Sequence, residues 1–211
     1  MNNMTFMELM GKGGWVMWIM FFASILIFTF LLERIWAFSK IGGGNSALIE
    51  RVKQHVRQGQ IKEAIGLCAQ NNKNFIFHVL EVGLHAAAFP REEMESIFAM
   101  YRMKMQALLN KRLAIFGTFA FIGPLLGLFG TVMGVIRAFS DLALSGSGGP
   151  TIVAAGIAES LIATAAGIFV AVSASLMYNF FTSLMRARMQ QYDLLTQEIA
   201  ILVYTGNSKG R

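Results

Sequence analysis

Glu159 is the residue whose surroundings point most directly to chemistry. It is the only charged residue between positions 151 and 185, in a stretch that is otherwise apolar or weakly polar. An ionisable side chain inside a membrane span is costly, so such residues face protein or water and often mark the route of a proton or an ion. We therefore predict a proton or ion pathway at Glu159. The alternative is a structural role, either an ion pair with Arg137 or a hydrogen bond between helices.

Two threonines are candidates for the same pathway. Thr131 lies about six residues from the end of its apolar stretch, which is close to the depth of Glu159, so the two side chains could face one cavity. The alternative is that Thr131 bonds to a carbonyl of its own helix, as membrane threonines often do. Thr164 follows Glu159 by five residues, about 140° around an ideal helix, and could line a neighbouring helix interface instead.

Small residues recur every three or four positions in the two apolar stretches that contain these polar residues. Such stripes let membrane helices approach closely, so we interpret them as packing surfaces. Their members include Gly123, Gly127, Gly130 and Gly134 in one stretch and Gly156, Ala163 and Gly167 in the other.

Other kinds of site are not supported. The run Gly11-Lys12-Gly13-Gly14 lacks the glycine spacing and the Ser/Thr of a phosphate-binding loop. The three histidines have no cysteine or carboxylate partners at ligand spacing, and no nucleophile–base pattern stands out. The single cysteine, Cys68, excludes an intramolecular disulfide. We expect neither an enzyme nor a bound metal or cofactor.

The composition indicates a membrane protein. Of the 211 residues, 55% are hydrophobic and only 14% are charged, against about a quarter charged in soluble domains. The charge is concentrated, with 12 Lys or Arg and 7 Glu between residues 33 and 112. We attribute the net charge of +6 to basic segments retained in the cytoplasm rather than to nucleic-acid binding.

The apolar stretches predict three transmembrane helices. The first holds no charge over residues 15–32, and it is too long and lacks the cleavage site expected of a signal peptide, the alternative. The third would extend about 50 Å as one helix, longer than a hydrocarbon core of about 30 Å, and should project into water. The predicted fold is an all-α membrane protein with three transmembrane helices and long cytoplasmic helical extensions.

The segment between the first two spans also reads as helical. We predict one amphipathic helix over residues 49–71, another over 75–88, and a third that begins near Pro90 and continues unbroken into the second span. Because basic residues gather in this segment and in the tail, we place both in the cytoplasm, and the amino terminus and the 137–150 loop in the periplasm. The predicted segments are a periplasmic amino terminus (1–14), transmembrane helix 1 (15–37), a cytoplasmic helical domain (38–112), transmembrane helix 2 (113–136), a periplasmic loop (137–150), transmembrane helix 3 extending into the cytoplasm (151–185), and a cytoplasmic helix and tail (186–211).

Two long motifs resemble the signatures of the ExbB/TolQ family and, more distantly, of MotA. The second span contains Pro124-Leu125-Leu126-Gly127-Leu128-Phe129-Gly130-Thr131-Val132 followed by Gly134, and the third contains Gly156-Ile157-Ala158-Glu159-Ser160-Leu161-Ile162-Ala163-Thr164-Ala165 followed by Gly167. The pairs Glu33-Arg34 and Tyr178-Asn179 agree as well. The chain departs from the family where Ala155 and Ser173 replace frequent prolines.

The resemblance implies a motor subunit driven by the proton motive force in the bacterial inner membrane. It implies a pentameric homo-oligomeric ring around the helices of a single-span ExbD/TolR-like dimer, which engages a TonB-like or TolA-like energy transducer. Thr131, Glu159 and Thr164 match the pore-lining polar positions of that family. A ring also suits the residues themselves, because three helices cannot easily enclose a wet cavity. The alternatives are an ion channel that needs no partner and a passive membrane scaffold.

Overall fold

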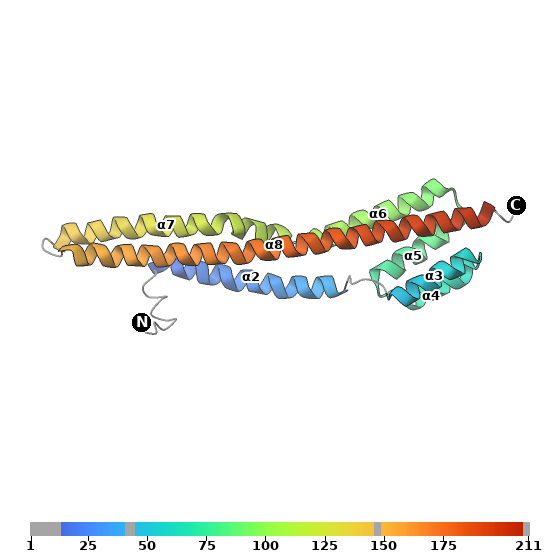
Figure 1. The fold of residues 1–211 in the computed structure, drawn as a ribbon, viewed down its shortest axis with the longest axis horizontal. Coiled ribbons are helices and arrows are strands. Elements are labelled where there is room, and N and C mark those ends of the chain that lie inside the picture. Colours follow the sequence, from blue (N-terminus) through green and yellow to red (C-terminus); the bar gives the residue numbers. More distant parts are fainter. Residues whose placement is uncertain (1–13, 41–44, 146–148, 209–211) are drawn as a thin grey trace. The chain divides into compact units, whose positions relative to one another are not determined.

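The computed structural model describes residues 14–40, 45–145 and 149–208, which are almost entirely helical (Figure 1). The helices are α2 (Gly14–Lys40), α3 (Ser46–Arg57), α4 (Ile61–Gln70), α5 (Phe75–His85), the short 3-10 helix η1 (Ala86–Ala88), α6 (Arg91–Asn110), α7 (Leu113–Ser145) and α8 (Gly149–Ser208). Most of the predicted amino-terminal segment 1–14, residues 146–148 and the last three residues lie outside the described chain.

Three regions are long and apolar enough to cross a membrane: Gly14–Ser39, Arg91–Leu144 and Val153–Thr205. The predicted all-α fold with three candidate membrane helices is thus confirmed. The helices extend further than the predicted spans. In particular, α7 continues to Ser145, so the predicted 137–150 loop is helical over residues 137–145. The 60 residues of α8 would measure about 90 Å at 1.5 Å per residue.

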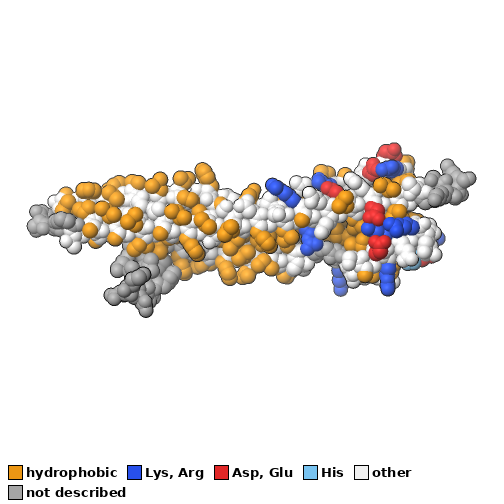
Figure 2. Space-filling view, viewed as in Figure 1, with side chains coloured by type: hydrophobic (Ala, Val, Ile, Leu, Met, Phe, Trp, Pro, Cys, Tyr) orange, Lys and Arg blue, Asp and Glu red, His pale blue; other side chains and the backbone are white. Residues whose placement is uncertain are grey.

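The chain divides into two units. The first, here called the apolar unit, contains the described residues of 1–32 together with Arg112–Phe181. The second, the charged unit, contains Glu33–Lys111 with Thr182–Arg211. Hydrophobic side chains dominate the visible face of the apolar unit, whereas Lys, Arg, Asp and Glu gather over the elements of the charged unit (Figure 2).

Within the apolar unit, α7 and the first part of α8 form an antiparallel pair, with α2 alongside (Figure 1). One stripe of α2 is buried, and its members recur at intervals of four, three and four residues: Val16, Met20, Ala23 and Ile27. This spacing keeps the four side chains on one face of a helix. The stripe therefore packs α2 onto its neighbours and leaves its other face free.

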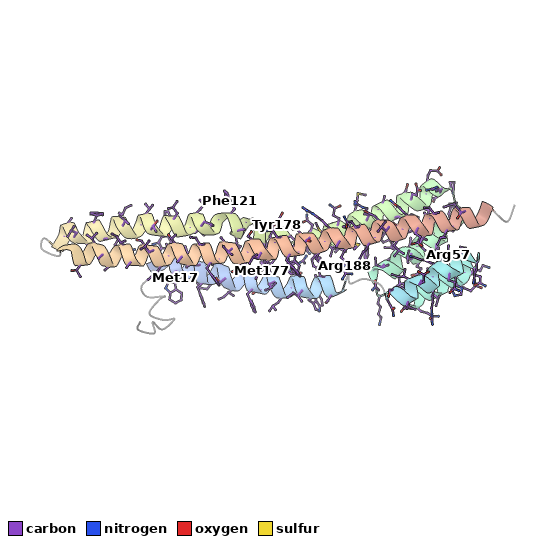
Figure 3. The ribbon with its side chains drawn as sticks, in the orientation of Figure 1. Met17, Arg57, Phe121, Met177, Tyr178 and Arg188 are labelled. Atoms are coloured by element: carbon purple, nitrogen blue, oxygen red, sulfur yellow. The ribbon has the colours of Figure 1, made fainter. Side chains whose placement is uncertain are left out.

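The remaining surface of the apolar unit is covered by large hydrophobic side chains. Phe121 is 73% exposed and points away from α7 (Figure 3). Phe22 on α2 and Phe169 on α8 are similarly exposed, at 64% and 73%. An apolar surface of this extent suits lipid and not water.

In the charged unit, one helix predicted from the sequence is interrupted at Gly59. The predicted single helix over residues 49–71 is two helices, α3 and α4, which pack against each other. Gly59 lies between them with φ of +75°, a left-handed conformation that ends a right-handed helix and that glycine adopts at low cost. Folding back in this way buries Val52 and Val56 of α3 with Ala64 and Cys68 of α4.

A second correction concerns the end of α6. We predicted a helix running from Pro90 into the second span, but α6 ends at Asn110 and α7 begins at Leu113. Arg112, between them, has φ of +64°, which is uncommon for a residue with a side chain.

Within the charged unit, Arg34 caps α6 near this break. Its Nη1 donates to the carbonyl oxygens of Leu108 and Leu109 at 3.4 and 3.3 Å. Carbonyls in the last turn of a helix have no partner within that helix. The guanidinium also binds both carboxylate oxygens of Glu33, at 2.8 and 2.7 Å. Arg34 is only 2% exposed, so these contacts compensate a buried charge.

Candidate functional site

Glu159 lies in the third turn of α8 and faces Arg137 of α7. Arg137 Nη1 and Glu159 Oε1 are 3.8 Å apart, an ion pair longer than a direct hydrogen bond of about 3 Å. The two side chains are 54% and 31% exposed, respectively. The ion pair that the sequence raised as the alternative for Glu159 is thus present, with its long geometry leaving the carboxylate free for other contacts.

A small cavity adjoins this pair. Its volume is about 10 Å³, and the residues that line it besides Glu159 and Arg137 are Gly14, Trp15, Val16, Gly130, Met133, Gly134 and Ala163. A cavity needs roughly 10–15 Å³ of such volume to hold one water molecule. This cavity, as the described residues form it, therefore holds at most one water molecule beside the carboxylate.

Thr131 does not line this cavity. Its hydroxyl donates to the carbonyl of Leu128 on the same helix at 2.6 Å, which is the local bonding that the sequence raised as the alternative. The backbone carbonyl of Thr131 accepts a hydrogen bond of 3.3 Å from Ser160. Thr131 is thus connected to the residue next to Glu159 through its backbone.

Thr164 lies at the α7–α8 contact. Its hydroxyl donates across the contact to the carbonyl of Gly127 at 2.9 Å. This position agrees with the five-residue separation of Thr164 from Glu159, which corresponds to an angle of about 140° around an ideal helix. Among the described residues of one chain, Glu159, Thr131 and Thr164 therefore do not line the same cavity.

Glycines make these close contacts between α7 and α8 possible. A Cβ at Gly127 would lie 3.0 Å from Cα of Thr164, and one at Gly167 would lie 2.6 Å from the carbonyl oxygen of Gly123. Cβ positions at Gly130, Gly134 and Gly156 would meet Ala163, Ser160 and Ala138, respectively. All seven small residues that we interpreted as packing positions thus lie where the two helices touch.

Two features of the site were not predicted from the sequence: the hydrogen bonds of Ser160 and the close approach of Gly14. Ser160 is 2% exposed, and besides its bond to Thr131 it donates to Gly156 of its own turn at 2.8 Å. Its position directly after Glu159 was the available signal. Gly14 approaches the carboxylate so closely that a Cβ there would collide with Glu159 Oε1; only the tertiary structure brings these two residues together. Among the residues that the structure describes, no cluster of three His, Cys, Asp or Glu side chains could hold a metal.

Several known proteins are similar to this chain in sequence. The model of the MotA/TolQ/ExbB proton channel family matches residues 69–194, which include Arg137, Glu159 and both threonines. An ExbB-like biopolymer transport protein of Synechocystis sp. is 30% identical over 201 residues, which cover 90% of this chain and 76% of that protein.

Two further relatives cover smaller parts. TolQ of the Tol-Pal system of Haemophilus influenzae is 41% identical over 98 residues, 46% of this chain and 42% of TolQ. The biopolymer transport protein ExbB of Pseudomonas putida is 26% identical over 191 residues, 86% of this chain and 56% of ExbB. The resemblance carried by the two long motifs is confirmed: the chain belongs to the MotA/TolQ/ExbB proton channel family, whose members are multi-pass inner-membrane motor subunits of the channel type and not enzymes.

Proposed function

We propose that this chain forms the ring of an ExbB/TolQ-like motor, which uses the proton motive force to energise transport or an envelope process. The observation that carries the proposal is Glu159. It is the only carboxylate between residues 151 and 185, and its one ion-pair partner among the described residues, Arg137, is 3.8 Å away. A carboxylate kept in a membrane helix at such cost suits reversible protonation better than packing.

The small cavity supports assembly into a ring. Its volume of about 10 Å³ admits at most one water, and the Glu159 side chain is 31% exposed, so surfaces from further copies or from a partner would enclose a wet path beside it. We propose a homo-oligomer, a pentamer by resemblance to the family, with α7 and α8 of each copy facing a central pore. The tight glycine contacts make this pair of helices a stiff wall for such a pore.

We propose that Thr131 and Thr164 line the same route as Glu159. Both hydroxyls already donate to backbone carbonyls, of Leu128 and Gly127 respectively. A hydroxyl that has used its only proton can still accept through its oxygen. The two threonines would therefore accept hydrogen bonds from water or from a protonated carboxyl, rather than donate them.

The remaining parts of the proposal concern the partner and the orientation. A single-span ExbD/TolR-like dimer would place its helices in the pore. An aspartate of that dimer would accept protons from Glu159. The amino terminus would lie in the periplasm, and the charged unit and carboxyl terminus in the cytoplasm, as the distribution of Lys and Arg favours. A TonB-like or TolA-like transducer would receive the motion. One proton crossing 100 mV releases about 2.3 kcal/mol, so a few protons per step can drive mechanical work.

The ion pair with Arg137 favours one second candidate, a passive scaffold in which Glu159 only holds α7 to α8. Two features weigh against this role. The pair is long and partly exposed, and such pairs contribute about 0–1 kcal/mol in water. In addition, Ser160 and Thr164 already bond α8 to α7.

The test is proton uptake by the complex, purified in mild detergent with its copurifying partners and reconstituted into liposomes under an imposed potential. We expect Glu159→Gln to abolish uptake and to leave the oligomer intact on size exclusion. The matched control is the same substitution at Glu63, which is exposed on α4 and should leave uptake unchanged. If Glu159 has only a scaffold role, Glu159→Gln should instead break up the oligomer, and Arg137→Gln in the same chain should restore it. Uptake by the bare oligomer without a partner would favour a self-sufficient channel.

A further inference from the structure

The first turn of α2 covers the carboxylate of Glu159, and Gly14 permits this close approach. Gly14 is the first residue of α2 and has φ of +65°, in the left-handed region that disfavours side chains. A Cβ at this position would collide with Oε1 of Glu159. A residue other than glycine at position 14 would therefore displace the carboxylate as well as strain the backbone.

Two sources of positive potential meet at this carboxylate. One is the guanidinium of Arg137, whose Nη1 lies 3.8 Å from Oε1. The other is the amino-terminal end of α2, because the free N–H groups of a first helical turn favour a negative charge nearby. Trp15 and Val16 of the same turn line the cavity beside Glu159, and Val16 is buried. The first turn of α2 thus lies against the carboxylate.

We propose that Gly14 is a positioning residue for Glu159. Its lack of a side chain lets the first turn of α2 hold the carboxylate beside Arg137, at the place from which the proton is passed on. The effect of Gly14 on proton flux rests on the function proposed above. Its effect on the position and accessibility of the carboxylate does not, and the two can be measured separately.

The experiment is a double-mutant cycle with Gly14→Ala and Glu159→Asp. Aspartate is shorter by one methylene, which withdraws the carboxylate by about 1.5 Å and makes room for the alanine methyl group. The matched control is Gly59→Ala. Gly59 has a similar φ of +75° but nothing within 4 Å of its Cβ position, so this substitution introduces the backbone strain without the collision.

Two readouts are applied to all variants. The first is proton uptake by the reconstituted complex. The second is the rate at which a hydrophobic carbodiimide labels residue 159, measured by mass spectrometry on the full chain. Labelling requires only that the carboxyl be reachable, so it reports on the cover provided by α2 even where no proton flows.

We expect Gly14→Ala to lower uptake and to speed labelling by about fivefold each, the effect of losing a partly exposed ion pair. Gly59→Ala should change either rate by less than about twofold. In the Glu159→Asp background the collision is gone, so Gly14→Ala should have no further effect on labelling. If Glu159→Asp alone conducts protons, Gly14→Ala should have no further effect on uptake either.

The inference is overturned if Gly14→Ala labels like the wild type, or if its effect persists undiminished in the Glu159→Asp background. Absence of uptake in the wild-type complex would instead count against the proposed function, and labelling would still decide the role of Gly14.

Discussion

Gly167 provides the sharpest test of how α7 and α8 are held together. A Cβ at Gly167 would lie 2.6 Å from the carbonyl oxygen of Gly123 and 2.9 and 3.0 Å from Cα and N of Gly127. All three atoms belong to the backbone, so no side-chain rotation relieves the clash. An ordinary contact begins at 3.4 Å, which requires the helices to separate locally by about 0.8 Å.

Two opposing contributions set the change in unfolding free energy for Gly167→Ala. Inserting one methyl group into a tightly packed interface costs about 1–3 kcal/mol. Replacing glycine by alanine within a helix returns up to about 1 kcal/mol through helix propensity. We therefore expect Gly167→Ala to lower the free energy of unfolding by a net ~1–2 kcal/mol.

The matched control is Gly117→Ala in α7. The atoms nearest to a Cβ at Gly117 belong to the ring of Tyr178, at 3.5 and 3.6 Å, which is ordinary contact. Without a clash, the helix propensity should stabilise this variant by ~0.5–1 kcal/mol. The two substitutions are chemically identical and lie in the same unit, so they differ mainly in the space available.

Thermal unfolding in detergent, followed by tryptophan fluorescence, measures the difference. About 2 kcal/mol between the variants corresponds to a Tm difference of roughly 4–8 °C for a chain of this size. Gly167→Ala should melt below the wild type, and Gly117→Ala at or above it. If Gly167→Ala melts at the temperature of Gly117→Ala or higher, α7 and α8 are not in close contact at Gly167.

Three further predictions concern the charged unit. Arg34→Met should lower the free energy of unfolding by about 2–3 kcal/mol, because the carbonyls of Leu108 and Leu109 lose a buried charged donor. Chemical denaturation measures this free energy. A decrease below about 1 kcal/mol, which is typical of an exposed ion pair, would contradict the prediction. Burial raises the pKa of the Cys68 thiol from 9.0 to about 12, so the folded chain at neutral pH should react with a maleimide at least ~100-fold more slowly than the unfolded chain. Because the pKa is higher in the folded chain, the contribution of the buried neutral thiol to stability is fully present below pH 9 and is lost as the pH rises towards about 12. Equal maleimide rates would show that α3 and α4 do not enclose Cys68. Finally, Tyr192→Phe removes a buried hydrogen bond to the Phe98 carbonyl at 2.7 Å and should lower the free energy of unfolding by ~1–2 kcal/mol. Asp193→Asn should lower it by less, because its partner Arg102 is 44% exposed. The opposite ranking in denaturant titrations would refute this comparison.

The sequence alone determined the membrane character, the helical fold and the family. Three charge-free stretches long enough to cross a bilayer favour a membrane protein, because a chain of this size has little interior in which to bury so many apolar residues. The family followed from two motifs in which glycine spacing and a membrane carboxylate occur together. The sequence also indicated a packing role for the small residues, because their spacing of three or four places them on one helix face.

Where helices end was harder to predict. Gly59 and Arg112 both adopt positive φ and both interrupt predicted helices. A glycine is tolerated inside many helices, and an arginine is a good helix former, so neither residue by itself announces a break. The break before α7 coincides with the capping of α6 by Arg34, a contact between residues more than seventy positions apart that no local pattern contains.

The arrangement around Glu159 depended on the tertiary structure in the same way. The sequence identified the carboxylate and named Arg137 as a possible partner, because membrane depth and charge can be counted along the chain. It could not indicate that Gly14 lies against the carboxylate, or that Thr131 and Thr164 direct their hydroxyls to Leu128 and Gly127. Those contacts depend on how three helices rotate about their axes when they pack. The rotation is set by the sum of many small contacts along the whole interface, and not by the spacing of any single motif.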